Sequence, residues 1–166
     1  MGIFSAAAAL FGKGWSQNTE PEPRASRPVA DTESKATVLI IDDDPSFLEA
    51  MRMVLRSGGY NVLASSTGPK GLDMVRYAGR DIAAVMLDFN MPRFNGADTL
   101  QFLRKLNPDL KVVAVSGVRL DELPEEFRAQ TDRFLPKPFN NSDLLKTLDD
   151  VLQAKALAEP HATAAA

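Results

Sequence analysis

The sequence contains no cysteine and only one histidine, and each of these shortages excludes a class of protein. Without cysteine there is no disulfide framework, no thiolate metal site and no redox chemistry through sulfur. The one histidine, His161, lies in an alanine-rich stretch near the end of the chain. Hydrolases with a Ser-His-Asp triad and metal sites built from several histidines are therefore excluded as well.

The chain also has fewer positively than negatively charged residues. The chain carries 19 Lys and Arg residues against 22 Asp and Glu residues, a formal net charge of −3, so it lacks the basic field that nucleic-acid binding usually requires. The basic residues of two predicted helices have no interleaved aromatics and are interpreted as solvated faces: Arg76, Arg80, Arg104 and Lys105. Direct contact with nucleic acid is not expected.

Long apolar runs are missing too. The longest, residues 3–11, is interrupted by Ser5 and is far shorter than the ~20 residues that cross a bilayer. The first residues lack the positive charge with which a secretory signal begins. We therefore expect a cytoplasmic protein.

Composition divides the 166 residues into three parts. Residues 1–35 hold an apolar segment followed by a stretch rich in Pro, Glu, Ser, Thr and Arg, which is typical of a flexible linker. Four residues of the apolar segment have helical spacing: Phe4, Ala8, Phe11 and Trp15. They would line a short helix that contacts a partner or a membrane surface, although a passive tail is favoured for so short a segment. Residues 36–153 form the predicted domain, and residues 154–166 an alanine-rich, disordered tail.

Within residues 36–153, short apolar runs alternate with amphipathic stretches, a pattern typical of βαβ units. Five runs are predicted to be strands: residues 37–41, 60–64, 82–87, 111–115 and 133–135. The first helix is predicted to begin at Pro45 and to stop at Gly58 and Gly59. The fourth helix should be short or irregular, because Pro124 interrupts it.

Strand composition predicts the order of the sheet. The first, third and fourth runs are almost wholly apolar, as expected for central strands covered on both faces. The second contains Asn61, and the fifth contains Arg133 and is followed by Pro136, which cannot donate to a neighbouring strand. The order 2-1-3-4-5 satisfies these constraints. It is the flavodoxin-like, doubly wound α/β fold, a (βα)5 parallel sheet whose binding crevice lies at the carboxyl ends of strands one and three.

Polar residues follow four of the predicted strands. They are Asp42, Asp43 and Asp44 after the first, Asp88 after the third, Ser116 after the fourth and Lys137 after the fifth. Parallel strands end at the same edge, so the carboxylates should converge there and repel one another unless a cation is present. Oxygen ligands without His or Cys favour Mg²⁺. With the Lys137 ammonium beside them, the pocket suits a phosphoryl group.

Several motifs occur in one consistent order over about residues 36–153. They are Ile40-Ile41-Asp42-Asp43-Asp44-Pro45, Gly59-Tyr60-x-Val62, Gly68-x-x-Gly71-Leu72, Met86-Leu87-Asp88 with Met91-Pro92 and Gly96, Val115-Ser116-Gly117, and Lys137-Pro138-Phe139. Together they resemble the receiver domain of two-component response regulators. Since no second globular domain is expected after residue 153, the resemblance is to a stand-alone receiver.

The resemblance implies a role for each acidic residue. Asp88 would be the phosphoacceptor, taking a phosphoryl group from a sensor histidine kinase or a histidine phosphotransfer protein. Asp88 and Asp43 would bind Mg²⁺ directly, Asp42 largely through water, and the backbone carbonyl of Asn90 would complete the protein's contacts with the metal. Beyond phosphorylation and dephosphorylation of Asp88, no enzymatic activity is implied.

The resemblance also implies a switch. Lys137 would pair with one phosphoryl oxygen, and Ser116 would donate a hydrogen bond to another once Asp88 is modified. Pro138 would follow a cis peptide bond to Lys137. Phe134 stands where the family has its switch aromatic, although an aromatic in a strand is by default core packing. The switch would change the face of helix four, strand five and helix five, whose implied partners are a downstream protein or a second copy of the chain.

Two alternatives remain open. Asp42-x-Asp44 after an apolar strand, with Ser116 and Lys137 later, resembles haloacid-dehalogenase-type phosphatases, but this interpretation lacks the family's later acidic pair and leaves Asp88 without a role. Asp44 is instead interpreted as a helix-capping acid. A receiver-like scaffold that works without phosphorylation would have lost one of its site residues, and Asp88, Ser116 and Lys137 are all present.

Overall fold

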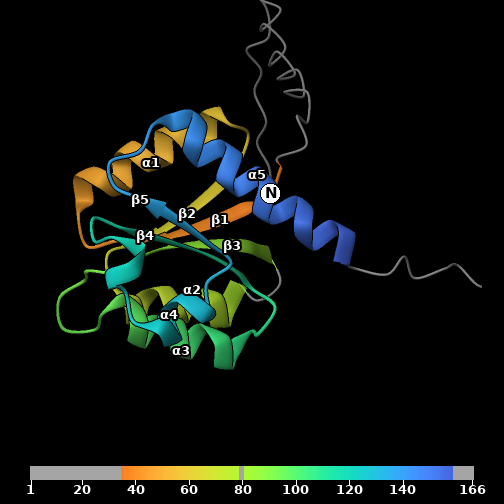
Figure 1. Cartoon of the computed structure of the whole chain (residues 1–166). Coiled ribbons are helices and arrows are strands. Elements are labelled where there is room, and N and C mark those ends of the chain that lie inside the picture. The colour runs from red at the N-terminus through yellow and green to blue at the C-terminus, as the bar shows by residue number, and fades with distance from the viewer. Residues whose placement is uncertain (1–34, 79–80, 159–166) are drawn as a thin grey trace, which may run out of the picture. The chain divides into compact units, whose positions relative to one another are not determined.

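Strands and helices alternate along the part of the chain that the structure, a computed structural model, describes: residues 35–78 and 81–158 (Figure 1). In chain order they are β1 (Thr37–Ile41), α1 (Pro45–Ser57), β2 (Asn61–Ser65), α2 (Gly68–Ala78), β3 (Ile82–Asp88), α3 (Gly96–Leu106), β4 (Lys111–Ser116), the 3-10 helix η2 (Leu120–Glu122), α4 (Glu125–Ala129), β5 (Arg133–Pro136) and α5 (Asn141–Ala158). The expectations for residues 1–34, for Arg80 and for residues 159–166 lie outside the described residues. None of the described helices is long and apolar enough to cross a membrane.

All five predicted strands are present, and their ends differ by at most one residue from the predicted bounds. The fourth helix is short, as expected: η2 precedes Pro124, and α4 begins directly after it. The C-terminal boundary differs from the prediction, because α5 continues past residue 153 to Ala158. The alanine-rich composition that suggested a tail also has the highest helix propensity, and this favours continuation of the helix.

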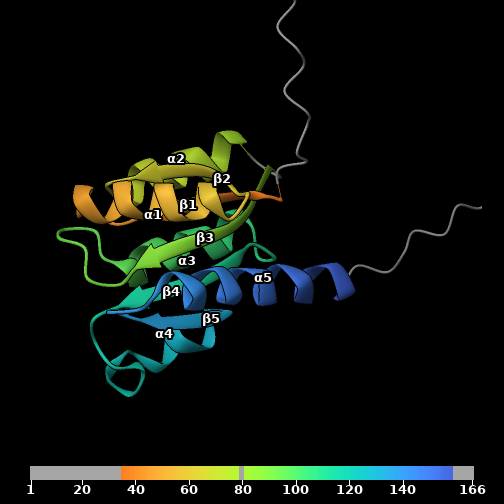
Figure 2. The same ribbon diagram turned by 90° about the horizontal axis from the view of Figure 1, so that it is seen from above.

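The five strands form one parallel sheet in the order β2-β1-β3-β4-β5, which confirms the predicted doubly wound fold. Helices α1 and α5 cover one face, and α2, α3 and α4 cover the other (Figures 1 and 2). Successive side chains of a strand point to opposite faces. In β1, Val38 and Ile40 therefore pack in the layer of α1 and α5, whereas Leu39 and Ile41 pack in the other layer. All four side chains are buried.

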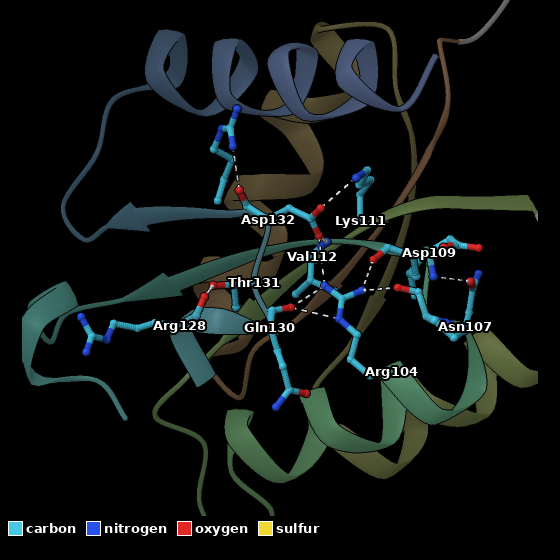
Figure 3. A network of polar contacts seen from close by, with 12 residues as sticks. Arg104, Asn107, Asp109, Lys111, Val112, Arg128, Gln130, Thr131 and Asp132 are labelled. Atoms are coloured by element: carbon cyan, nitrogen blue, oxygen red, sulfur yellow. Dashed lines mark hydrogen bonds and ion pairs between the residues drawn. The ribbon is translucent and has the colours of Figure 1, made fainter. Parts of the chain in front are cut away.

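Arg104 connects α3 to the loop between α4 and β5 (Figure 3). Its guanidinium donates hydrogen bonds to the carbonyl oxygens of Gln130 at 2.9 Å and Pro108 at 3.2 Å, and to that of Leu110. It also forms an ion pair with Asp132 at 3.0 Å. The prediction that Arg104 belongs to a solvated helix face is therefore wrong, and its side chain is only 19% exposed. Helical periodicity indicates which positions of a helix face away from the apolar core. It does not indicate whether a loop folds over those positions.

Asp132 stands at the centre of this network. Its carboxylate also accepts hydrogen bonds from the Lys111 ammonium at 2.8 Å and the Val112 backbone N–H at 2.9 Å. Burial raises the pKa of Asp132, but the bonds from Lys111, Val112 and Arg104 outweigh it and hold the pKa below its ordinary value. The network fixes the start of β5, whose other end leads into Lys137.

Candidate functional site

The carboxyl ends of β1, β3 and β5 bring three charged side chains together. The Lys137 ammonium donates to Oδ2 of Asp42 at 2.7 Å and to Oδ1 of Asp88 at 2.9 Å. Both carboxylates are buried, with exposed fractions of 2% and 5%, while the Lys137 side chain is 28% exposed. Two buried carboxylates thus share one ammonium group, and the three side chains together carry an excess of negative charge.

Backbone hydrogen bonds fix the orientation of both carboxylates. Oδ1 of Asp42 accepts the N–H of Asp44 at 2.9 Å, and Oδ2 of Asp88 accepts the N–H of Asn90 at 2.8 Å. In each case the donor lies two residues beyond the acid, the local arrangement that short acidic side chains favour where a strand ends. Each carboxylate therefore has one oxygen on the backbone and the other on Lys137.

The charges of this group respond to its burial. Burial raises the pKa of Asp88, and the Asp42 carboxylate raises it further. The hydrogen bond and charge of Lys137 and the N–H of Asn90 lower it, but the pKa stays above its ordinary value. For Lys137, burial lowers the pKa, and the bonds to Asp42 and Asp88 more than compensate, so its pKa is raised. Lys137 is therefore charged at neutral pH, next to a carboxylate that would gain from a further cation.

Asp43 lies beside this group and not within it. It is exposed, and it lines a cavity of about 370 Å³ together with residues 66–69, at the start of α2, and residues 91–94, which precede α3. Across the described residues, no group of three or more His, Asp or Glu side chains is arranged to hold a metal ion. The oxygen-only donor set and its excess negative charge nevertheless fit a hard divalent cation. Asn90, whose carbonyl is predicted to bind Mg²⁺, is exposed beyond the end of β3.

Ser116 and Lys137 are joined through the backbone at the ends of β4 and β5. The Lys137 N–H donates to the Ser116 carbonyl at 2.8 Å. The Ser116 side chain is fully buried, and its Oγ accepts the N–H of Val118 at 3.0 Å. Its neighbour Val115 is the register partner of Asp88. The Ser116 hydroxyl is thus one residue away from the strand position paired with the acid.

The other two residues of the predicted site lie on and after β5. Phe134 is half-buried and packs in the layer of α2, α3 and α4, on the sheet face away from α1 and α5. The peptide bond between Lys137 and Pro138 is cis. Phe134 thus lies three residues before Lys137, and the cis peptide bond follows Lys137 directly.

Gly96 allows α3 to begin directly against the end of β3. A Cβ at this position would lie 2.4 Å from the carbonyl oxygen of Asp88 and 2.6 Å from Cα of Phe89. Asn95 caps the helix by accepting the N–H of Asp98 at 2.8 Å. The glycine of the sequence motif is therefore a close-approach residue that sets the backbone after Asp88.

Asp44 is the N-cap of α1, as the sequence predicts: its Oδ1 accepts the N–H groups of Ser46 and Phe47. Phe47 is the residue of this site that the sequence analysis missed. Its ring centroid lies 4.0 Å from Nζ of Lys137. The available signal was an aromatic residue in the first turn of the helix that follows the acidic run.

The family of the chain follows from comparison with known proteins. Residues 38–149 match the model of the response regulator receiver domain, and the chain belongs to that family. The sensor kinase CckA of Brucella abortus is 32% identical over 124 residues, which cover 74% of this chain and 13% of that protein. The cell cycle transcriptional regulator CtrA of Caulobacter vibrioides is 28% identical over 118 residues, 70% of this chain and 50% of that regulator.

A solved structure shows the same fold. The response regulator receiver domain protein of Clostridium thermocellum superimposes with a TM-score of 0.70 at 26% identity, covering 75% of this chain and 99% of that one. The chain spans half or less of the length of the two curated relatives. It is thus a receiver domain of two-component response regulators, and nothing in these comparisons supports the phosphatase alternative.

Proposed function

We propose that this receiver takes a phosphoryl group onto Asp88 from a phosphohistidine, supplied by a sensor histidine kinase or a phosphotransfer protein in the cytoplasm. The observation that carries the proposal is the bridge from Lys137 to both Asp42 and Asp88. It places a fixed positive charge beside the acceptor oxygen and leaves the carboxylates incompletely neutralised. A site in which one ammonium faces two carboxylates favours the binding of a divalent cation together with an incoming anion.

The chain's own residues contribute mainly by orienting the Asp88 carboxylate. An oxygen of Asp88 attacks phosphorus in line, and the bond from phosphorus to the histidine nitrogen breaks. The N–H of Asn90 and the ammonium of Lys137 hold the carboxylate for that attack. After transfer, the same ammonium would pair with a phosphoryl oxygen.

Mg²⁺ would be held directly by Asp43, Asp88 and the carbonyl of Asn90, and through water by Asp42. When bound, it supplies positive charge for the phosphoryl oxygens. The support for this assignment is the oxygen-only donor set and the exposed position of Asp43 on the neighbouring cavity.

The response would start at Ser116. Its Oγ accepts the Val118 N–H, so the hydroxyl proton is available to a phosphoryl oxygen, and donation would draw the β4–α4 loop toward Asp88. Phe134 would then change its packing on β5. The face of α4, β5 and α5 would change its affinity for a downstream protein or a second copy of the chain. Beyond the turnover of phosphorylated Asp88, we propose no enzymatic activity.

The test is intact-mass measurement after incubation with acetyl phosphate and Mg²⁺. We expect the wild-type protein to gain one phosphoryl group and Asp88→Asn to gain none. Asp109→Asn, which changes an exposed acid on the loop after α3, is the matched control and should gain one. A phosphoryl group that remains on Asp88→Asn would reject the proposal.

A further inference from the structure

The ring of Phe47 contacts the Lys137 ammonium in addition to the two carboxylates. That ammonium has three N–H donors, and two of them are used by Asp42 and Asp88. Among the described residues, no other side chain or backbone oxygen accepts a hydrogen bond from it. The remaining contact is with the ring of half-buried Phe47, whose centroid lies 4.0 Å from Nζ. The ammonium therefore contacts two carboxylates and one aromatic ring, and 28% of the side chain's surface is exposed.

The ring is held in this position from two directions. Asp44, the N-cap of α1, accepts the backbone N–H of Phe47 at 3.3 Å. The ring of Phe139 packs edge-on against it, with centroids 6.1 Å apart and planes at 87°. Phe139 lies only two residues after Lys137, so the segment that carries the lysine also fixes the aromatic ring beneath it.

An aromatic ring does something at this position that neither a carboxylate nor water would do. Its face attracts a cation through the ring quadrupole without adding a formal charge. A third carboxylate would deepen the excess negative charge around Asp88. Water would leave the flexible four-carbon stem of lysine free to swing toward solvent. The ring restrains the ammonium and leaves the charge balance of the acceptor unchanged.

We propose that Phe47 is a positioning residue for phosphoryl acceptance, holding the Lys137 ammonium against Asp88 through a cation–π contact. This inference rests on the proposed function, because it concerns the rate at which Asp88 is phosphorylated. It assigns to Phe47 an electronic role as well as a packing role. The two roles are separated by changing the electron density of the ring at nearly constant shape.

The experiment replaces Phe47 with 4-fluoro-, 3,5-difluoro- and 3,4,5-trifluorophenylalanine, which weaken the ring quadrupole in steps. The rate of phosphorylation by acetyl phosphate at saturating Mg²⁺ is followed by intact mass. We expect the logarithm of the rate to fall with each added fluorine, to a total slowing of about threefold to tenfold. The matched control is trifluorophenylalanine at Phe102, whose ring faces Lys105 at 5.0 Å on α3, and it should leave the rate unchanged.

Two results would overturn the inference while the proposed function stands. One is a rate that is constant across the series while Phe47→Leu is slow, which would assign Phe47 to packing alone. The other is a Lys137 ε-methylene proton signal without the upfield ring-current shift that a face contact produces. Failure of the wild-type protein to gain a phosphoryl group would instead reject the proposed function, and this inference with it.

Discussion

The Nζ atom of Lys137 lies 2.7 Å from Oδ2 of Asp42, although 95 residues separate them in the sequence. Asp42 follows β1 and Lys137 follows β5, and both β3 and β4 lie between these strands in the sheet. The bridge therefore forms only when β1, β3, β4 and β5 are assembled in this order. Changes in strand packing far from Asp88 should consequently affect the site.

Gly96→Ala is expected to weaken both the fold and the site. The added Cβ would lie 2.4 Å from the Asp88 carbonyl oxygen, and backbone atoms must shift to admit it. We expect a loss of about 1–3 kcal/mol in the free energy of unfolding, measured with urea, and slower phosphorylation by acetyl phosphate. Gly117→Ala is the control for stability, because a Cβ added there would have no atom within 4 Å, and it should stay within about 0.5 kcal/mol of wild type. Equal stability of the two variants would contradict the close-approach role of Gly96.

Asp132→Asn should destabilise the protein in a pH-dependent manner. The pKa of Asp132 is lowered in the folded state, so its carboxylate stabilises the fold above the ordinary pKa of about 3.9, and this contribution is lost as the pH falls through the folded pKa. Near neutral pH we expect a loss of about 1–3 kcal/mol, because Arg104 and Lys111 lose their charged acceptor. Urea unfolding of both proteins at neutral and acidic pH measures the difference.

The matched control for that change is Asp121→Asn. Asp121 forms an ion pair with Arg119 at 3.0 Å, but both side chains are largely exposed. Such a pair contributes little, and the variant should match wild type at every pH to within about 0.5 kcal/mol. If Asp132→Asn behaved in the same way, the network of Figure 3 would not stabilise the start of β5.

Mg²⁺ should stabilise the folded protein through Asp43. At about ten times its dissociation constant, an ion that binds only the folded state adds about 1.4 kcal/mol to the free energy of unfolding. Thermal unfolding with Mg²⁺ and with EDTA should show this increase for the wild-type protein and for Asp109→Asn. In Asp43→Asn most of the increase should disappear. An undiminished increase in that variant would remove Asp43 from the proposed ligand set.

The sequence was sufficient to predict the fold and which residues meet where the strands end. Apolar β1, β3 and β4 must be central, and Asn61 and Pro136 place the other two strands at the edges. Because the strands are parallel, their end residues meet at one edge whatever the details of packing. Asp42 and Lys137 therefore lie at the same edge, and the long Lys137 side chain reaches Asp42 across the ends of the strands between them.

The remaining features depend on packing that a linear pattern does not contain. Asp43 is exposed in the bend that follows β1, whereas its neighbour Asp42 is buried, and the run of three acids does not indicate which of them turns inward. The contact of Phe47 with Lys137 joins α1 to the segment that follows β5. Arg104 is covered by a loop that has no periodicity of its own. For Phe47 and Arg104 the contacting residue comes from a segment that is distant in sequence.

The phosphorylated residue is located most directly by chemical trapping of its acyl phosphate. The protein is treated with acetyl phosphate and Mg²⁺ and then reduced with borohydride, which converts an aspartyl phosphate to homoserine, and the product is located by peptide mass mapping. We expect homoserine at position 88 and at no other acidic position. Homoserine at position 42 or 44, with Asp88 unmodified, would contradict it.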